Sequence, residues 1–229
     1  MQARLVASRL IAPDVKHFVF EVPETETLPY ESGQFVSFTR EFDGKPITRA
    51  YSTASAPSAN RFELCLNRVS DGIMSPWLFT IQPGETVEMT GPLGYFTLRD
   101  PARECIFAAT GTGIAPFRGM LLEHLPAHPE LRATLVFGVR YEASLMYRDE
   151  FEALARKYPN FRFWPVLSRP DDSWQGRTGH IQPYVLEALG DRRDIDVYIC
   201  GLHMMVDDLR TQLKGLGLDR KRIICEKYD

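Results

Sequence analysis

The chain has 229 residues, of which 44% are hydrophobic and 25% charged, so it can bury one large core or two small ones. Its net charge of −3 excludes the strongly basic domain that is typical of nucleic-acid binding. The start lacks the apolar core of a signal peptide, and no apolar run approaches the roughly 20 residues of a membrane span. We therefore expect a cytoplasmic protein with no nucleic-acid or membrane partner.

The first hundred residues alternate apolar and polar side chains, which is the pattern of β-strands with one buried face. Turn signals interrupt this pattern at residues 12–14, 32–33, 43–46, 82–85 and 91–94. Short strands at this spacing predict an antiparallel Greek-key β-barrel. One short helix is expected at 75–79, with Ser75 as its N-cap and Pro76 in its first position. The apolar positions of the strands are Phe18, Phe20, Val22, Phe62, Leu64, Leu66, Val87 and Met89.

The pattern changes after Asp100-Pro101, where apolar strands begin to alternate with helix-like segments. We predict five strands at 106–109, 134–138, 161–167, 197–200 and 223–225, with helices at 117–125, 149–158, 182–189 and 204–216. Crossovers of this length predict a doubly wound α/β domain, a five-stranded parallel sheet with helices on both faces. The two predicted domains are residues 1–99 and 100–229.

Residues 49–53 place an arginine, a tyrosine and two hydroxyls on one predicted strand. Arg49 and Tyr51 are two positions apart, so they share a face. A guanidinium pairs with a phosphate or with the electron-rich edge of a flavin, and a tyrosine stacks on its ring. Taken alone, such a pair is more often a solvated surface feature. The run Asp-Gly-Ile-Met-Ser-Pro at 71–76 adds a helix start, which suits a pyrophosphate.

A second glycine turn, Gly-Thr-Gly-Ile-Ala-Pro at 111–116, follows the predicted strand 106–109. Glycine permits close approach of the backbone to a ligand, and Pro116 opens the next helix. A proline stands where the dinucleotide fingerprint has its third glycine, so the turn alone also fits an ordinary strand–helix connection. Cys200 and Gly201 end another parallel strand, at the edge where open α/β sheets place their ligands.

The chain resembles the ferredoxin–NADP reductase family in the order and spacing of five motifs over nearly its whole length. These are Arg-x-Tyr-Ser, Gly-x-x-Ser, Gly-Thr-Gly-Ile-Ala-Pro, Cys-Gly-x-x-x-Met and a terminal Glu-x-Tyr. The resemblance implies a barrel that binds FAD, followed by a domain that binds NADP. The flavin contacts it implies are Arg49, Ala50, Tyr51, Ser52, Thr53, Leu66, Asn67, Arg68, Gly72, Ile73, Met74, Ser75, Thr112 and Tyr228.

The same resemblance implies hydride transfer between NADPH and the flavin. Ser52 would orient the flavin ring near N5, Cys200 and Glu226 would complete the nicotinamide pocket, and Tyr228 would cover the ring until nicotinamide displaces it. A hydroxyl and two cations are expected at the 2′-phosphate of NADP, namely Ser168, Arg169 and Arg177. Because a guanidinium suits a phosphate, these residues favour NADPH over NADH. The implied NADP contacts are Gly111, Thr112, Gly113, Ser168, Arg169, Arg177, Cys200, Gly201 and Met205.

The four cysteines are scattered, with no close pair to begin a metal or iron–sulfur site. A single-electron acceptor must therefore be a separate protein, and the resemblance implies a ferredoxin or flavodoxin. We expect the reductase itself to be a monomer. Such acceptors are acidic, which predicts a cationic docking surface. The candidate cations are Arg40, Lys45, Arg99, Arg103 and Arg118.

Three alternatives remain open at this point. The chain could be the NADH-dependent ferredoxin reductase component of an oxygenase, or a free-flavin reductase that releases its product. A third possibility is a non-catalytic electron-transfer subunit, although such subunits usually carry their own cluster cysteines.

Overall fold

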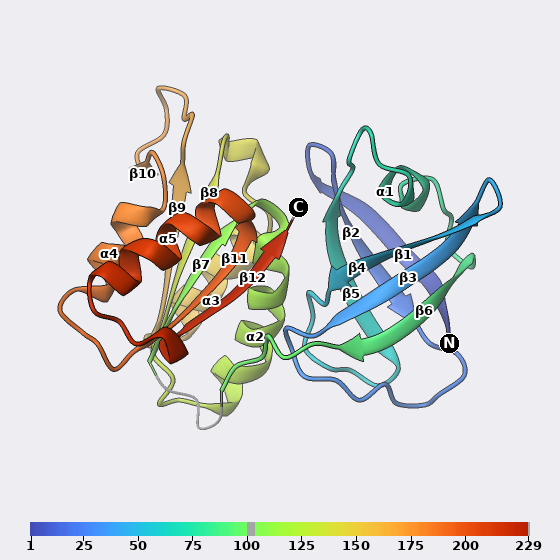
Figure 1. Ribbon diagram of the computed structural model, residues 1–229, viewed down its shortest axis with the longest axis horizontal. Coiled ribbons are helices and arrows are strands. Elements are labelled where there is room, and N and C mark those ends of the chain that lie inside the picture. Colours follow the sequence, from blue (N-terminus) through green and yellow to red (C-terminus); the bar gives the residue numbers. More distant parts are fainter. Residues whose placement is uncertain (100–103, 229) are drawn as a thin grey trace. The chain divides into compact units, whose positions relative to one another are not determined.

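The computed structural model describes residues 1–99 and 104–228, and the chain divides into two compact units (Figure 1). Unit 1 contains Met1–Leu98 and Ala115–Glu123, and unit 2 contains Arg99–Ile114 and the residues from His124 onward. The predicted domain boundary adjoins residues 100–103, which lie outside the described residues, so the domain limits stay a prediction.

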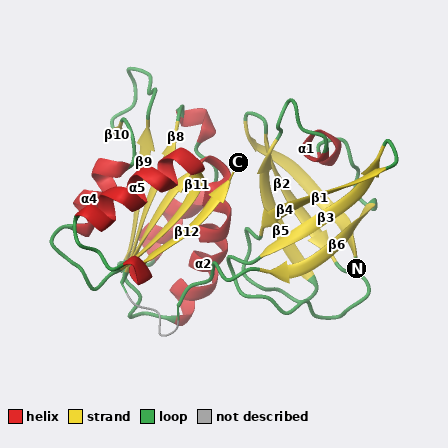
Figure 2. Cartoon of the chain, in the orientation of Figure 1, coloured by secondary structure: helices red, strands yellow, loops and turns green. Residues whose placement is uncertain are grey.

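Unit 1 is built on a six-stranded antiparallel sheet in the order β4-β3-β6-β1-β2-β5 (Figure 2). β6 enters between β3 and β1, which makes the connections of Greek-key type, as predicted. The outer strands meet where Thr53, just after β4, forms a bridge with Leu64 of β5, and this bridge closes the barrel. The strands are β1 (Gln2–Ala12), β2 (Val15–Glu21), β3 (Phe35–Phe42), β4 (Lys45–Ser52), β5 (Arg61–Asn67) and β6 (Thr86–Leu93).

Local turn chemistry sets the registers of this sheet. Asp43 and Gly44 form the two-residue turn between β3 and β4, and both have positive φ, as a type I′ hairpin requires. Lys45 and Pro46 were predicted to belong to that turn but already pair within β4. The apolar face of the strands fills the barrel, and its centre is a group of fully buried rings from Phe18, Phe20, Phe38 and Phe62.

Unit 2 is a parallel sheet in the order β10-β9-β8-β7-β11-β12. Its strands are β7 (Cys105–Thr110), β8 (Ala133–Val139), β9 (Phe161–Leu167), β10 (Arg177–Thr178), β11 (Asp196–Leu202) and β12 (Ile223–Tyr228). Its helices are α2 (Ile114–Ala127, of which Ala115–Glu123 belong to unit 1), α3 (Arg148–Lys157), α4 (Gln182–Leu189) and α5 (His203–Gly215). Single 3-10 turns lie at Gly111–Gly113, Glu142–Ser144 and Arg220–Arg222.

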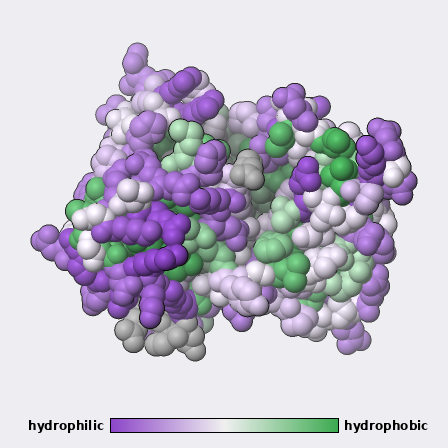
Figure 3. Space-filling view, in the orientation of Figure 1, coloured by the Kyte–Doolittle hydropathy of each residue, from purple (hydrophilic) through white to green (hydrophobic). Residues whose placement is uncertain are grey.

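Helices cover both faces of this sheet, so the doubly wound prediction is confirmed. On one face, α4 and α5 pack on Val136, Val166 and Ile199. On the other, Phe151 of α3 packs on Phe163 of β9, with ring centres 5.3 Å apart. The outer side of α5 carries mainly hydrophilic residues (Figure 3), as expected for a helix with one buried stripe.

The prediction of five strands was one short. The sixth strand, β10, pairs only Arg177 with Val166 and Thr178 with Leu167. Two residues carry no periodicity that a sequence pattern could reveal, so this strand is set by its pairing with β9. In the described part of the chain, no helix has the length and apolar character needed to cross a membrane.

Candidate functional site

The predicted flavin-contact strand is β4, which lies at one end of the unit 1 sheet order. Arg49 pairs with Phe38 and Tyr51 with Val36, so the two side chains do share a face. Arg49 is exposed, whereas the Tyr51 ring lies 5.7 Å from the Phe38 ring at the edge of the core. Burial raises the pKa of Tyr51, and its phenol therefore stays protonated at neutral pH.

The hydroxyl residues that follow on this strand are buried. Ser52 is 7% exposed and Thr53 is fully buried. The Thr53 hydroxyl and backbone N–H both donate to the Gln34 carbonyl, at 2.9 and 2.8 Å. These two bonds fix the backbone after β4 to the residue that precedes β3, while Ala50 stays exposed.

The next three predicted flavin contacts along the chain differ in their surroundings. Leu66 is 4% exposed and belongs to the barrel core, so only its backbone can face a ligand. Asn67 and Arg68 are exposed, and the Arg68 N–H donates to the Asp14 carbonyl at 2.8 Å.

The predicted pyrophosphate turn at 71–76 leads into α1 (Met74–Leu78), and one detail of the prediction was wrong. The N-cap is Ile73, not Ser75, and Pro76 is the third helical residue. The Ser75 hydroxyl instead accepts a hydrogen bond from the Val69 N–H at 3.0 Å, which holds the turn against the helix. Gly72 is half-buried and Ile73 is 51% exposed, whereas Met74 points into the core.

The order of the unit 2 strands reverses direction between β7 and β11, which is where open α/β sheets bind ligands. Thr110 ends β7, and its hydroxyl accepts from the Leu202 N–H at 3.3 Å. A Cβ on Gly201, whose φ is +141°, would lie 2.2 Å from that hydroxyl oxygen. A Cβ on Gly113 would lie 2.3 Å from the Cys200 carbonyl oxygen. Both glycines are therefore needed for the close approach of the two strand ends.

Gly111, in contrast, has no heavy atom within 4 Å of the position a Cβ would take, and its φ is +53°. Open space beside a backbone at the start of α2 is what a pyrophosphate needs, so this turn fits a dinucleotide. The helix begins at Ile114, two residues before Pro116, which the sequence had placed at its start. Sequence reasoning missed Thr110, although a polar residue ending an apolar strand before a glycine turn was a usable signal.

Three residues predicted near the nicotinamide lie close together toward the ends of β11 and β12: Cys200, Glu226 and Tyr228. Cys200 pairs with Glu226, and Leu202 pairs with Tyr228. Burial and the nearby Glu226 carboxylate raise the pKa of Cys200 well above its ordinary value, while a hydrogen bond with Tyr228 acts in the opposite direction. Cys200 is therefore a neutral thiol at physiological pH, suited to contact and not to nucleophilic attack.

The predicted 2′-phosphate residues lie at the carboxyl end of β9. The Ser168 N–H donates to Val139 and the Arg169 N–H to Arg140, and the Arg169 side chain is exposed. The Arg177 side chain already has partners within the protein: its guanidinium lies 3.9 Å from the Trp164 ring centre and 3.4 Å from a Glu187 carboxylate oxygen. β9 and β11 are three strand spacings apart, roughly 14 Å, so a ligand that touches both must be extended. Met205, in the first turn of α5, packs against the core.

The predicted docking cations do not form one exposed set. Arg118 is only 9% exposed and is ion-paired with Glu63, so its prediction as a surface cation was wrong. Arg40 is exposed but stacks 4.2 Å from the Trp77 ring centre, and Lys45 is exposed. Arg99 pairs with Asp196 at 3.6 Å. Arg103, like Asp229, lies outside the described residues.

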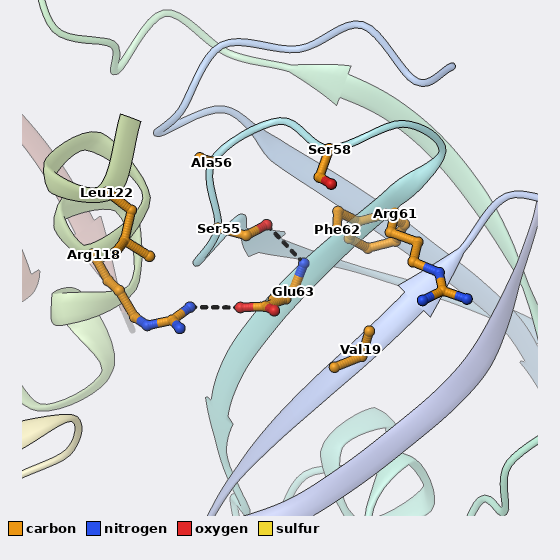
Figure 4. Close-up of a pocket in the computed structure, with 9 residues that line it drawn as sticks. All are labelled: Val19, Ser55, Ala56, Ser58, Arg61, Phe62, Glu63, Arg118 and Leu122. Carbon is orange, nitrogen blue, oxygen red and sulfur yellow. Dashed lines mark hydrogen bonds and ion pairs between the residues drawn. The ribbon is translucent and has the colours of Figure 1, made fainter. Parts of the chain in front are cut away.

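A pocket of about 380 Å³ lies over β5 in unit 1 (Figure 4). Its polar lining includes Ser55, Ser58, Glu63 and Arg118, and it contains none of the predicted flavin contacts. We therefore assign no part of the flavin to it. Among the described residues, no group of three or more His, Cys, Asp or Glu side chains could hold a metal ion.

Comparison with known proteins identifies the family. The Oxidoreductase FAD-binding domain model matches residues 2–98, and the Oxidoreductase NAD-binding domain model matches residues 107–211. A ferredoxin–NADP reductase B from Sorangium cellulosum is 41% identical over 239 residues, covering 100% of this chain and 97% of that protein. The chain belongs to the ferredoxin–NADP(+) reductase family.

Other members of the ferredoxin–NADP(+) reductase family are also similar to it. The solved structure of an Amycolatopsis cytochrome P450 reductase is 31% identical with a TM-score of 0.89, and the match covers 99% of this chain and 69% of that one. The toluate 1,2-dioxygenase electron transfer component of Pseudomonas putida is 29% identical, with 88% and 59% coverage. The chain described here is therefore an FAD- and NAD(P)-dependent oxidoreductase, and the predicted pair of cofactor types is confirmed.

Proposed function

We propose that the protein is a ferredoxin–NADP reductase that transfers hydride between NADPH and its FAD, and single electrons between the FAD and a ferredoxin or flavodoxin. The observation that carries this proposal is the extent of the match. The chain spans 97% of a ferredoxin–NADP reductase but only 59% of an oxygenase electron transfer component. Identity is also higher to the ferredoxin–NADP reductase, at 41%, than to the oxygenase component, at 29%.

Bound FAD supplies the chemistry that links two-electron and one-electron carriers. The protein supplies alignment. In unit 1, Arg49 and Tyr51 would hold the flavin, and the buried Ser52 would set the ring orientation. The turn from Gly72 to Ser75 would lie against the pyrophosphate.

In unit 2, the open backbone at Gly111 would receive the nicotinamide dinucleotide, and Thr110 would keep that turn against Gly201. Cys200 and Glu226 would surround the nicotinamide, with Cys200 as a protonated thiol that excludes water and carries no charge. Tyr228 would lie over the flavin when nicotinamide is absent.

The preference for NADPH is proposed to depend on Arg169. Its guanidinium is exposed and no ion pair to it is present among the described residues, while Arg177 is stacked on Trp164. A charge-assisted hydrogen bond to a phosphate contributes about 1.5–3 kcal/mol, so Arg169→Ala should raise KM for NADPH by about 10- to 100-fold. KM for NADH should change less than twofold. Equal effects on both would reject the assignment.

Arg162→Ala is the matched control, because Arg162 is an exposed arginine near the start of β9, whereas Arg169 follows the end of that strand. It should leave both KM values unchanged.

The whole proposal is tested by steady-state comparison of NADPH and NADH with a ferredoxin as acceptor. Ferredoxin reduction that is at least tenfold more efficient with NADPH supports it. Preference for NADH favours the oxygenase component instead. A protein that purifies colourless and releases reduced flavin is a free-flavin reductase, and one that reduces no artificial acceptor is an electron-transfer subunit.

A further inference from the structure

The segment at residues 52–56, which continues the flavin-contact strand β4, is held by a buried arginine of α2. One guanidinium nitrogen of Arg118, Nη1, donates to the Ala54 carbonyl at 2.6 Å and to a Glu63 carboxylate oxygen at 2.5 Å. Arg118 is 9% exposed and Ala54 is fully buried. All three residues belong to unit 1. Figure 4 shows the Arg118 side chain directed from α2 toward Glu63 on β5.

Neighbouring contacts remove the remaining freedom of this segment. The Ala54 N–H donates to the Glu63 carbonyl at 2.7 Å, and the Ser55 hydroxyl accepts from the Glu63 N–H at 3.0 Å. The Tyr30 hydroxyl lies 2.8 Å from that of Ser55. A Cβ on Gly119 would lie 2.8 Å from the Ser55 carbonyl oxygen, so the helix backbone itself sits against the segment.

The positive charge beside the Glu63 carboxylate comes from Arg118. His17 also approaches the same Glu63 oxygen, at 3.7 Å, but burial lowers the pKa of His17 to about 4. The imidazole is therefore neutral at pH 7, and Arg118 is the cation that balances Glu63. The half-buried Glu63 carboxylate and the buried Ala54 carbonyl both accept from one nitrogen, so removing that nitrogen leaves two polar groups without that donor.

We infer that Arg118 is a positioning residue for the flavin site: by fixing the Ala54 carbonyl and Glu63, it sets the position of the end of β4, where Ser52 and Thr53 are the proposed FAD contacts. This inference rests on the proposed flavin contacts of Ser52 and Thr53. Thr53 is covalently joined to Ala54, and its two hydrogen bonds to the Gln34 carbonyl restrict the backbone between them. A shift of the Ala54 carbonyl is thus transmitted to the end of β4.

The test measures FAD binding to the apoprotein by quenching of flavin fluorescence, and the visible circular dichroism of the bound flavin. Arg118→Met should raise the Kd for FAD at least tenfold and alter the dichroism. Leu5→Ala is the control, because Leu5 is a buried residue of β1, which neighbours neither β4 nor β5 in the sheet. At an equal loss in Tm, this variant should keep its FAD affinity within threefold of wild type.

An unchanged Kd in Arg118→Met, or an equal loss in Leu5→Ala, overturns the inference. If Arg118→Met does not fold, the inference is tested by comparing the Kd for FAD of Arg118→Lys with that of Glu63→Gln. Glu63→Gln keeps the bond from Arg118 to Ala54, so it should weaken FAD less than Arg118→Lys, and the reverse order overturns the inference. A wild-type apoprotein that binds no FAD refutes the proposed function instead, so the two failures are distinct.

Discussion

Gly113 offers a sharp test of how the dinucleotide turn is built. Its φ of −61° is accessible to any residue, so Gly113→Ala changes only the space that the side chain needs. The added Cβ would lie 2.3 Å from the Cys200 carbonyl oxygen, 2.6 Å from its carbon and 2.7 Å from the Gly201 nitrogen. All three are backbone atoms of the paired strand β11, which cannot rotate away. The start of α2 and the end of β11 must therefore separate by roughly 1 Å.

Overpacking of this kind typically costs 1–3 kcal/mol, and a contact with backbone belongs at the upper end, about 3 kcal/mol. For a chain of this size, we expect Tm to fall by roughly 6–12 °C. A displacement of 1 Å in a positioning element can lower catalytic efficiency about 100-fold. We therefore expect kcat/KM for NADPH to fall far more than the affinity for FAD, because the turn belongs to unit 2.

Urea unfolding gives the stability change, and steady-state kinetics with ferricyanide give the change in kcat/KM. Gly215→Ala is the matched control, since no heavy atom lies within 4 Å of its Cβ position and it ends α5. That variant should be neutral or more stable by up to about 1 kcal/mol. The free energy of unfolding is resolved to about 0.5 kcal/mol in such comparisons. If Gly113→Ala changes it by less than that and keeps the wild-type kcat/KM for NADPH, the close packing between the start of α2 and the end of β11 is refuted.

Two further outcomes follow from the site. Because burial lowers the pKa of His17 from 6.5 to about 4, the unfolded chain binds a proton below pH 6.5 that the folded chain does not. Stability should fall by roughly 2–3 kcal/mol between pH 6.5 and 4, and His17→Gln should remove that part. Urea midpoints at pH 7 and 4.5 measure it, and parallel losses in both proteins would contradict it. Tyr228→Ser should increase the affinity for oxidised NADP and its charge-transfer absorbance, if Tyr228 competes with nicotinamide for the flavin; unchanged titrations would show that it does not.

The sequence predicted the α/β unit closely because each element there is long enough to carry its own periodicity. The strand at Phe161–Leu167 and the helix at Gln182–Leu189 have the predicted limits. β10 escaped because a two-residue strand exists only through its pairing with β9. In the barrel, the shared face of Arg49 and Tyr51 followed from the period of two.

What the sequence could not predict depends on contacts between distant positions. Arg118 and Glu63 are separated by 55 residues, and an arginine met only in the sequence is most often a surface cation. Its burial arises only when α2 packs on the outer side of β5. Ser75 was similarly misassigned as a cap because its real partner, the Val69 N–H, comes from the preceding turn. The roles of the flavin and nicotinamide contacts remain predictions that the mutants above address.

The placement of the thiols has a practical consequence. Cys65 is buried in unit 1, while Cys105 and Cys200 are buried in unit 2, and burial raises the pKa of both of the latter. An alkylating dye can therefore reach these sulfur atoms only when the surrounding structure opens. Mass spectrometry of the labelled cysteines, sampled over time in mild denaturant, would show which of the two units opens first.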